Sequence, residues 1–501
     1  MAIFEDRHAF INGSIHASSN TKPIEAIDPS TLQPIAKIYT SSQSTLDAAV
    51  QAGSTAFPSW SQTPSIERSR ILLKAAGILR SRTQQLAIIE TQSTGKPYSE
   101  TSTVDIPTGA DVLEYYANLI GSGGLNGESF QLRSSAWVYT TKASLGVCVG
   151  IGAWNYPIQI ALWKSAPCLA AGNCMVYKPS EFTSLHAEEL AKIYKDAGLP
   201  DGVFNVVYGG GEVGAYLTKH PEVAKVSFTG QVSTGRKVAG SAAGEMKYVT
   251  MELGGKSPVI VLPDADVDTA VDGAMMANFF STGQVCTNGT RVFVPRPMKQ
   301  KFEKVLVEKM QYVRAGDLFA ESTNYGPLVS KAHHDKVVSY IKHGIETDKA
   351  TLLYGGLDTE TLTKTLPEKI KKGLWVRPTV FTDCSDDMKI VKEEIFGPVM
   401  SILFYDTIDE AVRRANDTPM GLAAGVFGKD INNCHDVVRQ LEAGITWVNT
   451  WGESPAEMSV GGWKQSGVGV ENGRKGLEAW VKNKSTLVEM GGSVATVYAK
   501  L

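Results

Sequence analysis

The sequence predicts an α/β protein organised around two parallel sheets. Short, mainly apolar runs alternate along the chain with segments of helical periodicity, and a turn containing Gly or Pro follows each run. Apolar runs of this kind are typical of strands inside a parallel sheet, with helices covering both of its faces. Such sheets bind ligands beyond the carboxyl ends of their strands, so functional residues are expected in the turns.

The elements of the first half follow in order. Apolar residues recur at helical spacing over 46–57 and 66–80, and Ser65-Ile66-Glu67 is a typical helix start. Four strand-and-turn units come next, and two of their turns lead into clear helices. We predict strands over 147–151, 174–177, 203–207 and 225–228, and helices over 184–197 and from the turn at Thr229-Gly230 through Ala239.

A second series of strands and helices begins at residues 257–262 and continues to about residue 450. The Gly-rich segment 121–130 is expected to be a connector, and the charged, Thr-rich segment 358–372 an exposed loop. The sequence contains no internal repeat and no low-complexity tract. Two halves of similar architecture are therefore the simplest interpretation.

Composition excludes several classes of protein. A chain of 501 residues exceeds one hydrophobic core and should form two to four domains. With 43% hydrophobic and 20% charged residues it is an ordinary globular protein, and a net charge of -3 provides no electrostatic basis for binding nucleic acid or an anionic membrane. Six scattered cysteines without a CxxC motif favour a reducing compartment over disulfides or zinc: Cys148, Cys168, Cys174, Cys286, Cys384 and Cys434.

The sequence shows no segment that would insert into a membrane. The longest apolar stretch, 145–160, is interrupted by Asn155 and Pro157 and is expected to be core and loop. The first residues lack the basic region and apolar core of a secretory signal, so a cytoplasmic protein is expected. The last three residues, Ala499-Lys500-Leu501, differ by one small residue from the Ser-Lys-Leu peroxisomal signal, which makes the peroxisome the alternative.

Cys286 and Glu252 form a candidate catalytic pair. The thiol follows the small residues Ser281-Thr282-Gly283, and the carboxylate precedes Gly254-Gly255, so both are expected to be accessible or movable. Together they indicate covalent catalysis followed by attack of an activated water. The alternative is that Cys286 is a small buried hydrophobic residue, as most lone cysteines are.

A candidate nucleotide site follows the strand at 225–228. Gly230 and Gly235 lie five residues apart at a helix start, where backbone N–H groups and the helix dipole favour a pyrophosphate, although the spacing is not GxGxxG. Glu252 lies 22 residues after Gly230, where dinucleotide folds place a ribose-binding acid. Glu252 therefore has two candidate roles, and Lys178 with Glu181 is an alternative ribose clamp.

Five motifs, taken together, resemble those of the aldehyde dehydrogenase superfamily, in family order and over essentially the whole chain. They are Trp154-Asn155-Tyr156-Pro157, Lys178-Pro179-Ser180-Glu181, Glu252-Leu253-Gly254-Gly255-Lys256, Gly283-Gln284-Val285-Cys286 and Glu394-Ile395-Phe396-Gly397-Pro398. The stretch 449–458 is most similar to betaine aldehyde dehydrogenases, which oxidise trimethylammonio-acetaldehyde to glycine betaine.

The resemblance implies a role for each catalytic residue. Cys286 would add to the aldehyde, and the resulting oxyanion would be held by the Asn155 amide and the Cys286 N–H, each such donor being worth about 3 kcal/mol. Glu252 would then activate the water that hydrolyses the thioester. Lys164 and Glu471 match proposed charge- or proton-relay positions, although Val470 replaces a common Arg; the alternative is an ordinary ion pair.

The resemblance also implies a dinucleotide cofactor, NAD, with NADP as the alternative. Lys178 and Glu181 would bind the adenosine ribose, Gly230 and its neighbours the pyrophosphate, and Glu394 with Phe396 the second ribose, which releases Glu252 from that role. Gln231 replaces the usual Ser after the pyrophosphate glycine. The implied cofactor residues are Gly152, Ala153, Trp154, Lys178, Pro179, Ser180, Glu181, Gly230, Gln231, Val232, Ser233, Gly235, Gly254, Glu394 and Phe396.

The choice of aldehyde depends on the pocket. A quaternary ammonium is held by aromatic faces, and the family's aldehyde-entry positions fall on Tyr156, Trp163, Phe280 and Trp451. Glu453 or Glu457 would add a counter-charge, and 4-trimethylaminobutyraldehyde or other ω-aminoaldehydes would fit the same cage. The alternative is that these aromatic side chains fill the core. Ser93 replaces the Asp of a monovalent-cation site, so no metal is expected.

The resemblance divides the chain into three parts and makes a homo-oligomer, a dimer or a tetramer, the expected state. Residues 1–124 with 144–251 would form a Rossmann-like cofactor-binding domain and 252–448 a Rossmann-like catalytic domain. Residues 125–143 with 449–501 would form a small β oligomerisation element and the C-terminal segment. Two other functions are alternatives. A coenzyme-A-acylating enzyme would not need Glu252, so its presence argues against that function. A non-catalytic structural protein would not need Cys286, Glu252 and Asn155 together.

Overall fold

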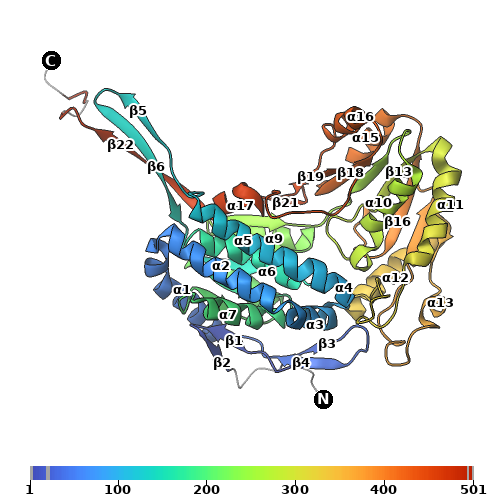
Figure 1. The fold of residues 1–501 in the computed structure, drawn as a ribbon, viewed down its shortest axis with the longest axis horizontal. Coiled ribbons are helices and arrows are strands. Elements are labelled where there is room, and N and C mark those ends of the chain that lie inside the picture. Colours follow the sequence, from blue (N-terminus) through green and yellow to red (C-terminus); the bar gives the residue numbers. More distant parts are fainter. Residues whose placement is uncertain (1–3, 18–22, 493–495, 499–501) are drawn as a thin grey trace.

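The computed structural model describes residues 4–17, 23–492 and 496–498, so the terminal tripeptide 499–501 lies outside the described residues. The chain forms two bodies, each built around one large sheet, and a narrow arm that projects from the first body (Figure 1). The predicted α/β class with two parallel-sheet bodies is confirmed. The domain boundaries and the oligomeric role of the arm stay predictions.

The first body contains an eight-stranded sheet in the order β2-β1-β9-β8-β7-β10-β11-β21. Its five central strands are parallel, and the four strands predicted from the sequence are among them. The strands are β1 (Ala9–Ile11), β2 (Ser14–His16), β7 (Val147–Ile151), β8 (Cys174–Lys178), β9 (Phe204–Val206), β10 (Val223–Thr229), β11 (Tyr248–Glu252) and β21 (Gly467–Val468).

Helices cover both faces of this sheet because alternate strand residues point to opposite sides. In β7, Cys148 belongs to the core beneath α2, α5, α6 and α7, whereas Val147 and Val149 belong to the core beneath α1 and α8. The helices are α1 (Gln43–Gln62), α2 (Ser65–Ser81), α3 (Thr83–Thr94), α4 (Tyr98–Glu100), the π-helical η1 (Thr101–Asp105), α5 (Ile106–Gly121), α6 (Pro157–Ala170), α7 (His186–Ala197), α8 (Gly211–Lys219) and α9 (Val232–Gly244).

The helices at 46–57 and 66–80 are confirmed, and α1 is longer than predicted. Its start lies at Gln43 because the Ser42 side chain caps it, its Oγ accepting from the Thr45 N–H at 3.3 Å. Helix α9 likewise continues past Ala239 to Gly244. The spacing of apolar residues predicted the buried middle of each helix. The ends of the helices lack this spacing, so their exact bounds could not be predicted from it.

The second body contains a seven-stranded sheet in the order β14-β15-β16-β13-β12-β18-β19, parallel except for β14. Its strands are β12 (Pro258–Val261), β13 (Arg291–Pro295), β14 (Thr351–Tyr354), β15 (Thr379–Thr382), β16 (Val399–Tyr405), β18 (Ala423–Phe427) and β19 (Ile445–Val448). Its helices are α10 (Val267–Phe279), η2 (Phe280–Gly283), η3 (Arg296–Met298), α11 (Lys299–Lys309), η4 (Met310–Tyr312), α12 (Lys331–Glu346), α13 (Glu360–Thr363), α14 (Lys389–Lys392), α15 (Ile408–Asn416) and α16 (Ile431–Val438).

The predicted exposed loop at 358–372 is partly buried. It includes the short helix α13, and Leu366 and Ile370 pack against Trp375 in a small separate core. The charged and Thr residues of this segment predicted an exposed loop, but its three apolar residues, Leu362, Leu366 and Ile370, all belong to this small core or pack against it.

The remaining strands are antiparallel. The arm consists of β5 (Ser129–Arg133), β6 (Ala136–Ser144) and β22 (Val481–Glu489), and two small pairs are β3 (Ile24–Ile27) with β4 (Pro34–Ile38) and β17 (Met420–Gly421) with β20 (Trp463–Lys464). After the second body the chain returns to the first: Gly467 pairs with Glu252 in β21–β11, and α17 (Gly473–Glu478) follows. Among the described residues, no helix is both long and apolar enough to cross a membrane.

Candidate active site

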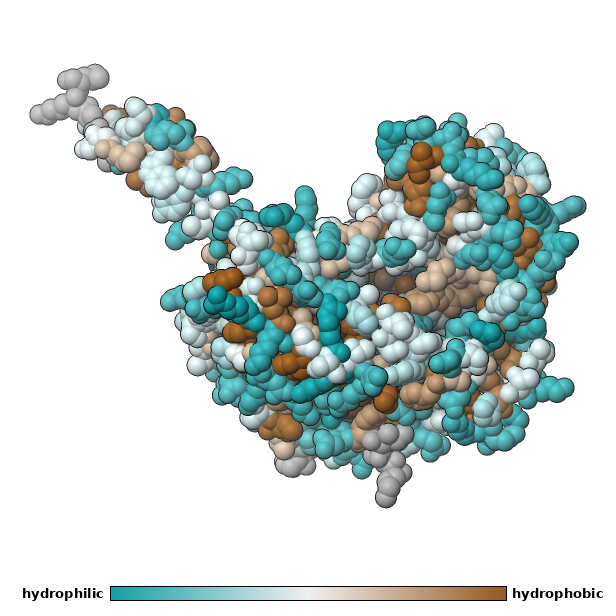
Figure 2. Space-filling view, in the orientation of Figure 1, coloured by the Kyte–Doolittle hydropathy of each residue, from teal (hydrophilic) through white to brown (hydrophobic). Residues whose placement is uncertain are grey.

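A cavity of about 910 Å³ lies between the two bodies. The carboxyl ends of β7, β8, β10 and β11 form one wall, and loops of the second body around Cys286, Glu394 and Trp451 form the other. Figure 2 shows the surface hollowed between the two bodies. Of the predicted site residues, the cavity is lined by Gly152, Ala153, Trp154, Asn155, Tyr156, Trp163, Ser180, Glu181, Gly230, Gln231, Glu252, Gly254, Phe280, Cys286, Glu394, Phe396, Trp451 and Glu471.

Cys286 is the accessible cysteine of the six. The other five are buried, whereas Cys286 is half-buried and lines the cavity. The alternative of a buried structural cysteine therefore describes the other five and not this one. Burial, together with the nearby carboxyls of Glu394 and Glu252, raises the pKa of the Cys286 thiol to about 12. The thiol is thus neutral at pH 7 before any ligand binds.

The loop that carries the thiol has an unusual backbone. Ser281 and Thr282 follow α10 with φ of 50° and 56°, in the left-handed region that non-glycine residues rarely adopt. Contacts with neighbouring segments hold this turn. The Thr282 Oγ1 donates to the Gly326 carbonyl at 3.0 Å, and the Gln284 Oε1 accepts from the Val329 N–H at 3.0 Å. A conformation of this kind persists only where its surroundings enforce it.

Asn155 lies against the same loop. It is buried after β7, and its Nδ2 donates to the Gln284 carbonyl at 3.0 Å, two residues before the thiol. A primary amide has two N–H groups, so one orients the side chain and the other can donate to a ligand in the cavity. This arrangement fits the predicted oxyanion-binding role.

Glu252 lies at the end of β11 with its carboxyl group buried. Neither carboxyl oxygen has a hydrogen-bond partner among the described residues. The segment after it contacts the thiol loop, since a Cβ at Gly255 would lie 3.1 Å from the Cys286 carbonyl oxygen. Burial raises the pKa of Glu252 well above its ordinary value, the Glu471 carboxyl raises it further, and the Lys164 ammonium opposes both.

Lys164 and Glu471 form a fully buried ion pair near Glu252. The Lys164 Nζ lies 2.7 Å from the Glu471 Oε1, and the Ser227 hydroxyl bonds to both side chains. The second Glu471 oxygen has no partner among the residues that the structure describes. The pair therefore fits the ion-pair alternative directly, and its orphaned oxygen leaves an acceptor free for a relay.

The end of the cavity beside β10 has the backbone expected at a pyrophosphate site. Gly230 follows β10, and α9 begins at Val232 without a side-chain cap, so its first N–H groups are open to a ligand. Gly235 has a packing role, because a Cβ there would overlap the Leu253 side chain. Thr234 lines the cavity, and Val232, Ser233 and Gly235 do not.

Lys178 and Glu181 lie together at the end of β8, where a ribose would bind. The Lys178 Nζ donates to the Pro179 carbonyl at 3.0 Å and lies 3.6 Å from the Glu181 Oε2. Lys178 and Pro179 lie behind the cavity wall, while Ser180 and Glu181 face it. Burial lowers the pKa of the Lys178 ammonium. These residues fit a dinucleotide with free ribose hydroxyls.

An aromatic cluster surrounds Glu394 and Phe396. Glu394 accepts from the Gly255 N–H at 3.2 Å, and Phe396 has a left-handed φ of 61°. The centroid of the Phe396 ring lies 5.2 Å from that of the Trp154 ring. The backbone carbonyl oxygen of Phe396 lies 2.7 Å from the His333 Nε2. This position for Glu394 and Phe396 fits a role at the second ribose.

The sequence analysis missed His333 and Lys336. Both belong to α12 and line the cavity beside Phe396. Burial lowers the pKa of His333 to about 4, so it is a neutral hydrogen-bonding group. The two residues are three apart on one helix face, but no motif marked them, because their importance comes only from where α12 packs.

The four predicted aromatic residues all line the cavity, in different surroundings. The Lys96 Nζ lies 3.2 Å from the centroid of the Tyr156 ring, so one face of that ring is already taken by a cation. Trp451 is buried with its ring 4.9 Å from Trp447, which fits the core-filling alternative in part. Tyr156 also precedes α6, which begins at Pro157, rather than lying on a helix face with Trp163.

Neither predicted counter-charge, Glu453 or Glu457, forms an ion pair with another residue that the structure describes. Glu453 lines the cavity, and its Oε1 accepts from Thr450 at 3.0 Å, whereas Glu457 does not line it. The Ser93 hydroxyl, at the position of the family's cation-linked Asp, donates to the Ile89 carbonyl of its own helix at 2.7 Å. Within the described ranges, no three His, Cys, Asp or Glu side chains are grouped to bind a metal ion.

The chain is similar to known proteins over almost its whole length. The sequence model of the aldehyde dehydrogenase family matches residues 15–486. Similar solved structures include an indole-3-acetaldehyde dehydrogenase with NAD⁺ (36% identity, 96% of each chain, TM-score 0.92) and a γ-glutamyl-γ-aminobutyraldehyde dehydrogenase from Burkholderia cenocepacia (36%, 96% of each chain, 0.91). A point mutant of betaine aldehyde dehydrogenase from Staphylococcus aureus, with NAD⁺, is 34% identical over 98% of this chain and 99% of that one, with a TM-score of 0.92.

Proposed function

This chain belongs to the aldehyde dehydrogenase family, which uses NAD or NADP, and we propose that it oxidises aldehydes bearing a cationic group, with betaine aldehyde as the preferred substrate and NAD as the acceptor. The observation that supports the reaction is the meeting of Cys286, Asn155 and Glu252 at one cavity. The aromatic lining of that cavity supports the choice of substrate.

Each step has a residue in place. The Cys286 thiol loses its proton to water as its sulfur adds to the aldehyde carbon, while the free N–H of Asn155 and the Cys286 backbone N–H stabilise the oxyanion. NAD, when bound, supplies the hydride acceptor that leaves the substrate as a thioester of Cys286. Glu252 takes a proton from the water that hydrolyses the thioester. The nearby ion pair acts on the pKa of Glu252 in both directions, since the Glu471 carboxyl raises it and the Lys164 ammonium lowers it.

The cationic end of the substrate would be held by aromatic faces. Since Lys96 already occupies one face of Tyr156, the cage depends mainly on Trp163, Phe280 and Trp451. The exposed Glu453 carboxylate at the cavity supplies opposite charge, which also favours longer ω-aminoaldehydes such as 4-trimethylaminobutyraldehyde. These longer substrates are the second candidate.

The test is a comparison of kcat/KM with NAD for betaine aldehyde, 4-trimethylaminobutyraldehyde, indole-3-acetaldehyde and acetaldehyde. We expect one of the two trimethylammonium substrates to give the highest value. A higher value for either uncharged aldehyde would contradict the cationic substrate. Cys286→Ala should abolish NADH formation, whereas Cys384→Ala, which alters a buried cysteine away from the cavity, should not. Activity in the first variant would contradict the covalent mechanism.

A further inference from the structure

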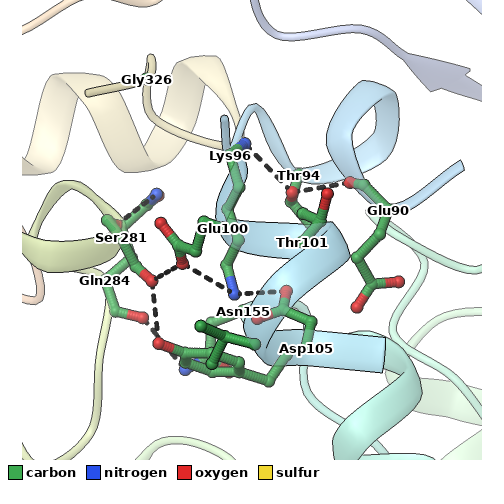
Figure 3. A network of polar contacts seen from close by, with 12 residues as sticks. Glu90, Thr94, Lys96, Glu100, Thr101, Asp105, Asn155, Ser281, Gln284 and Gly326 are labelled. Carbon is green, nitrogen blue, oxygen red and sulfur yellow. Dashed lines mark hydrogen bonds and ion pairs between the residues drawn. The ribbon is translucent and has the colours of Figure 1, made fainter. Parts of the chain in front are cut away.

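A buried cluster of charged side chains that includes Lys96, Glu100 and Asp105 (Figure 3) does not line the cavity. The Lys96 Nζ lies 2.9 Å from the Asp105 Oδ2 and 3.4 Å from the Glu100 Oε1, and all three side chains are at most 7% exposed. Glu90 belongs to the same cluster. Burying several carboxylates around one ammonium is costly, so the cluster calls for a role beyond stability.

Glu100 connects this cluster to the thiol loop. Its Oε1 accepts a hydrogen bond from the Ser281 hydroxyl, and the Ser281 Oγ lies 2.8 Å from the Tyr156 hydroxyl. Ser281 is the first of the two left-handed residues that precede Cys286. Because a serine adopts this conformation only where contacts enforce it, the bond to Glu100 is one of the forces that shape the loop.

Lys96 fixes the other side of the same junction. Its ammonium lies over the Tyr156 ring at 3.2 Å and pairs with Glu100 and Asp105. Tyr156 directly follows Asn155, whose amide bonds to the thiol loop. The Glu100 carboxylate therefore bonds directly to the segment that carries the nucleophile, and it is linked through Lys96 and Ser281 to the segment that carries the oxyanion donor.

We propose that Glu100 is a positioning residue for the reaction: held by Lys96, it fixes Ser281 and Tyr156 and so sets the position of Cys286 relative to Asn155. The proposal rests on the proposed function, in which Cys286 is the nucleophile. Glu100 does not line the cavity, so it has no direct contact with substrate or cofactor, and its removal should impair the chemical step while leaving the KM for NAD unchanged.

The experiment uses the full chain and its best aldehyde substrate. Single-turnover NADH formation, the KM for NAD and the apparent Tm are measured for Glu100→Ala, Glu100→Gln, Ser281→Ala and the double variant Glu100→Ala with Ser281→Ala. The matched control is Glu303→Ala, because the Glu303 carboxylate also accepts from a hydroxyl, that of Thr382, far from the cavity.

We expect Glu100→Ala and Ser281→Ala to slow hydride transfer by roughly 10- to 100-fold, the scale of a small misplacement of reacting groups. The double variant should be no slower than the slower single variant, because both act through one hydrogen bond. Glu100→Gln should recover most of the rate, since its amide oxygen still accepts from Ser281. Glu303→Ala should keep the wild-type rate.

The proposal is overturned if both single variants keep the wild-type rate, or if their effects multiply in the double variant. It is also overturned if the KM for NAD rises in proportion to the loss of rate. Should Glu100→Ala fail to fold, Ser281→Ala decides alone: a wild-type rate, or a KM for NAD that rises in proportion to the loss of rate, overturns the proposal. Activity that survives Cys286→Ala would instead contradict the proposed function, which separates the two failures.

Discussion

The reactivity of Cys286 in the ligand-free protein is the most direct prediction from the site. Burial, with the carboxyls of Glu394 and Glu252, raises the pKa of this thiol to about 12. Only the thiolate is a good nucleophile. We therefore expect iodoacetamide to alkylate Cys286 slowly at neutral pH, and the rate to increase with pH.

The size of the effect follows from two opposing factors. At pH 7.5 a free cysteine of pKa about 8.5 is roughly 10% thiolate, whereas a thiol of pKa about 12 is ionised about 3,000-fold less. A thiolate of higher pKa is more nucleophilic, by about 40-fold for this difference. The net expectation is a rate roughly 100-fold below that of free cysteine.

The assay follows alkylation of Cys286 by mass spectrometry between pH 6.5 and 9.5, where the rate should increase close to tenfold per pH unit, as expected well below the pKa. Glu394→Gln, which removes the larger carboxyl contribution, should increase the rate at fixed pH. Glu303→Gln is the control, since Glu303 does not line the cavity. A plateau below pH 9, or a neutral-pH rate equal to that of free cysteine, would refute the reasoning.

Three further predictions concern the surroundings of the thiol. Lys164→Met leaves the Glu471 carboxylate buried without its partner, which should cost about 3–5 kcal/mol of stability; a loss below about 1 kcal/mol in urea unfolding would contradict this. Gly235→Val places a side chain against Leu253, where there is no space, and should cost about 1–3 kcal/mol and raise the KM for NAD; an unchanged melting temperature would show that the helix can shift freely. Glu181→Ala removes the carboxylate that repels a 2′-phosphate beside a buried lysine, so the ratio of kcat/KM for NADP to that for NAD should increase about tenfold, equivalent to about 1.4 kcal/mol; an unchanged ratio would place the adenosine ribose elsewhere.

The central strands could be predicted from the sequence because they are buried on both faces. The predicted strand at 147–151 is the observed one, since a continuous apolar run has no other place in an α/β protein. The edge strands could not be predicted in this way. Strand β21 has two residues, and it exists only because Gly467–Val468 meets β11, more than 200 residues earlier in the chain.

The site shows the same division. The residues after β7, β8, β10 and β11 line the cavity as expected, because the carboxyl ends of parallel strands converge at one edge. The cation over Tyr156 and the carboxylate bonded to Ser281 were not predicted, since each contact joins residues far apart in sequence. Residue spacing identifies motifs within one segment of the chain. These contacts depend instead on how α3 and the helices that follow it pack against the segments that contain Tyr156 and Ser281.

The return of the chain from the second body to the first has a consequence for synthesis on the ribosome. Strand β11, which ends at Glu252, acquires its neighbour β21 only after residue 468 has been made, and Lys164 acquires its partner only at Glu471. Cys286 is therefore translated well before the Lys164–Glu471 ion pair near Glu252 can form. A nascent chain that ends after the second sheet would carry the Cys286 thiol without the residues that complete the surroundings of Glu252, so we expect full activity only after residue 471 has emerged.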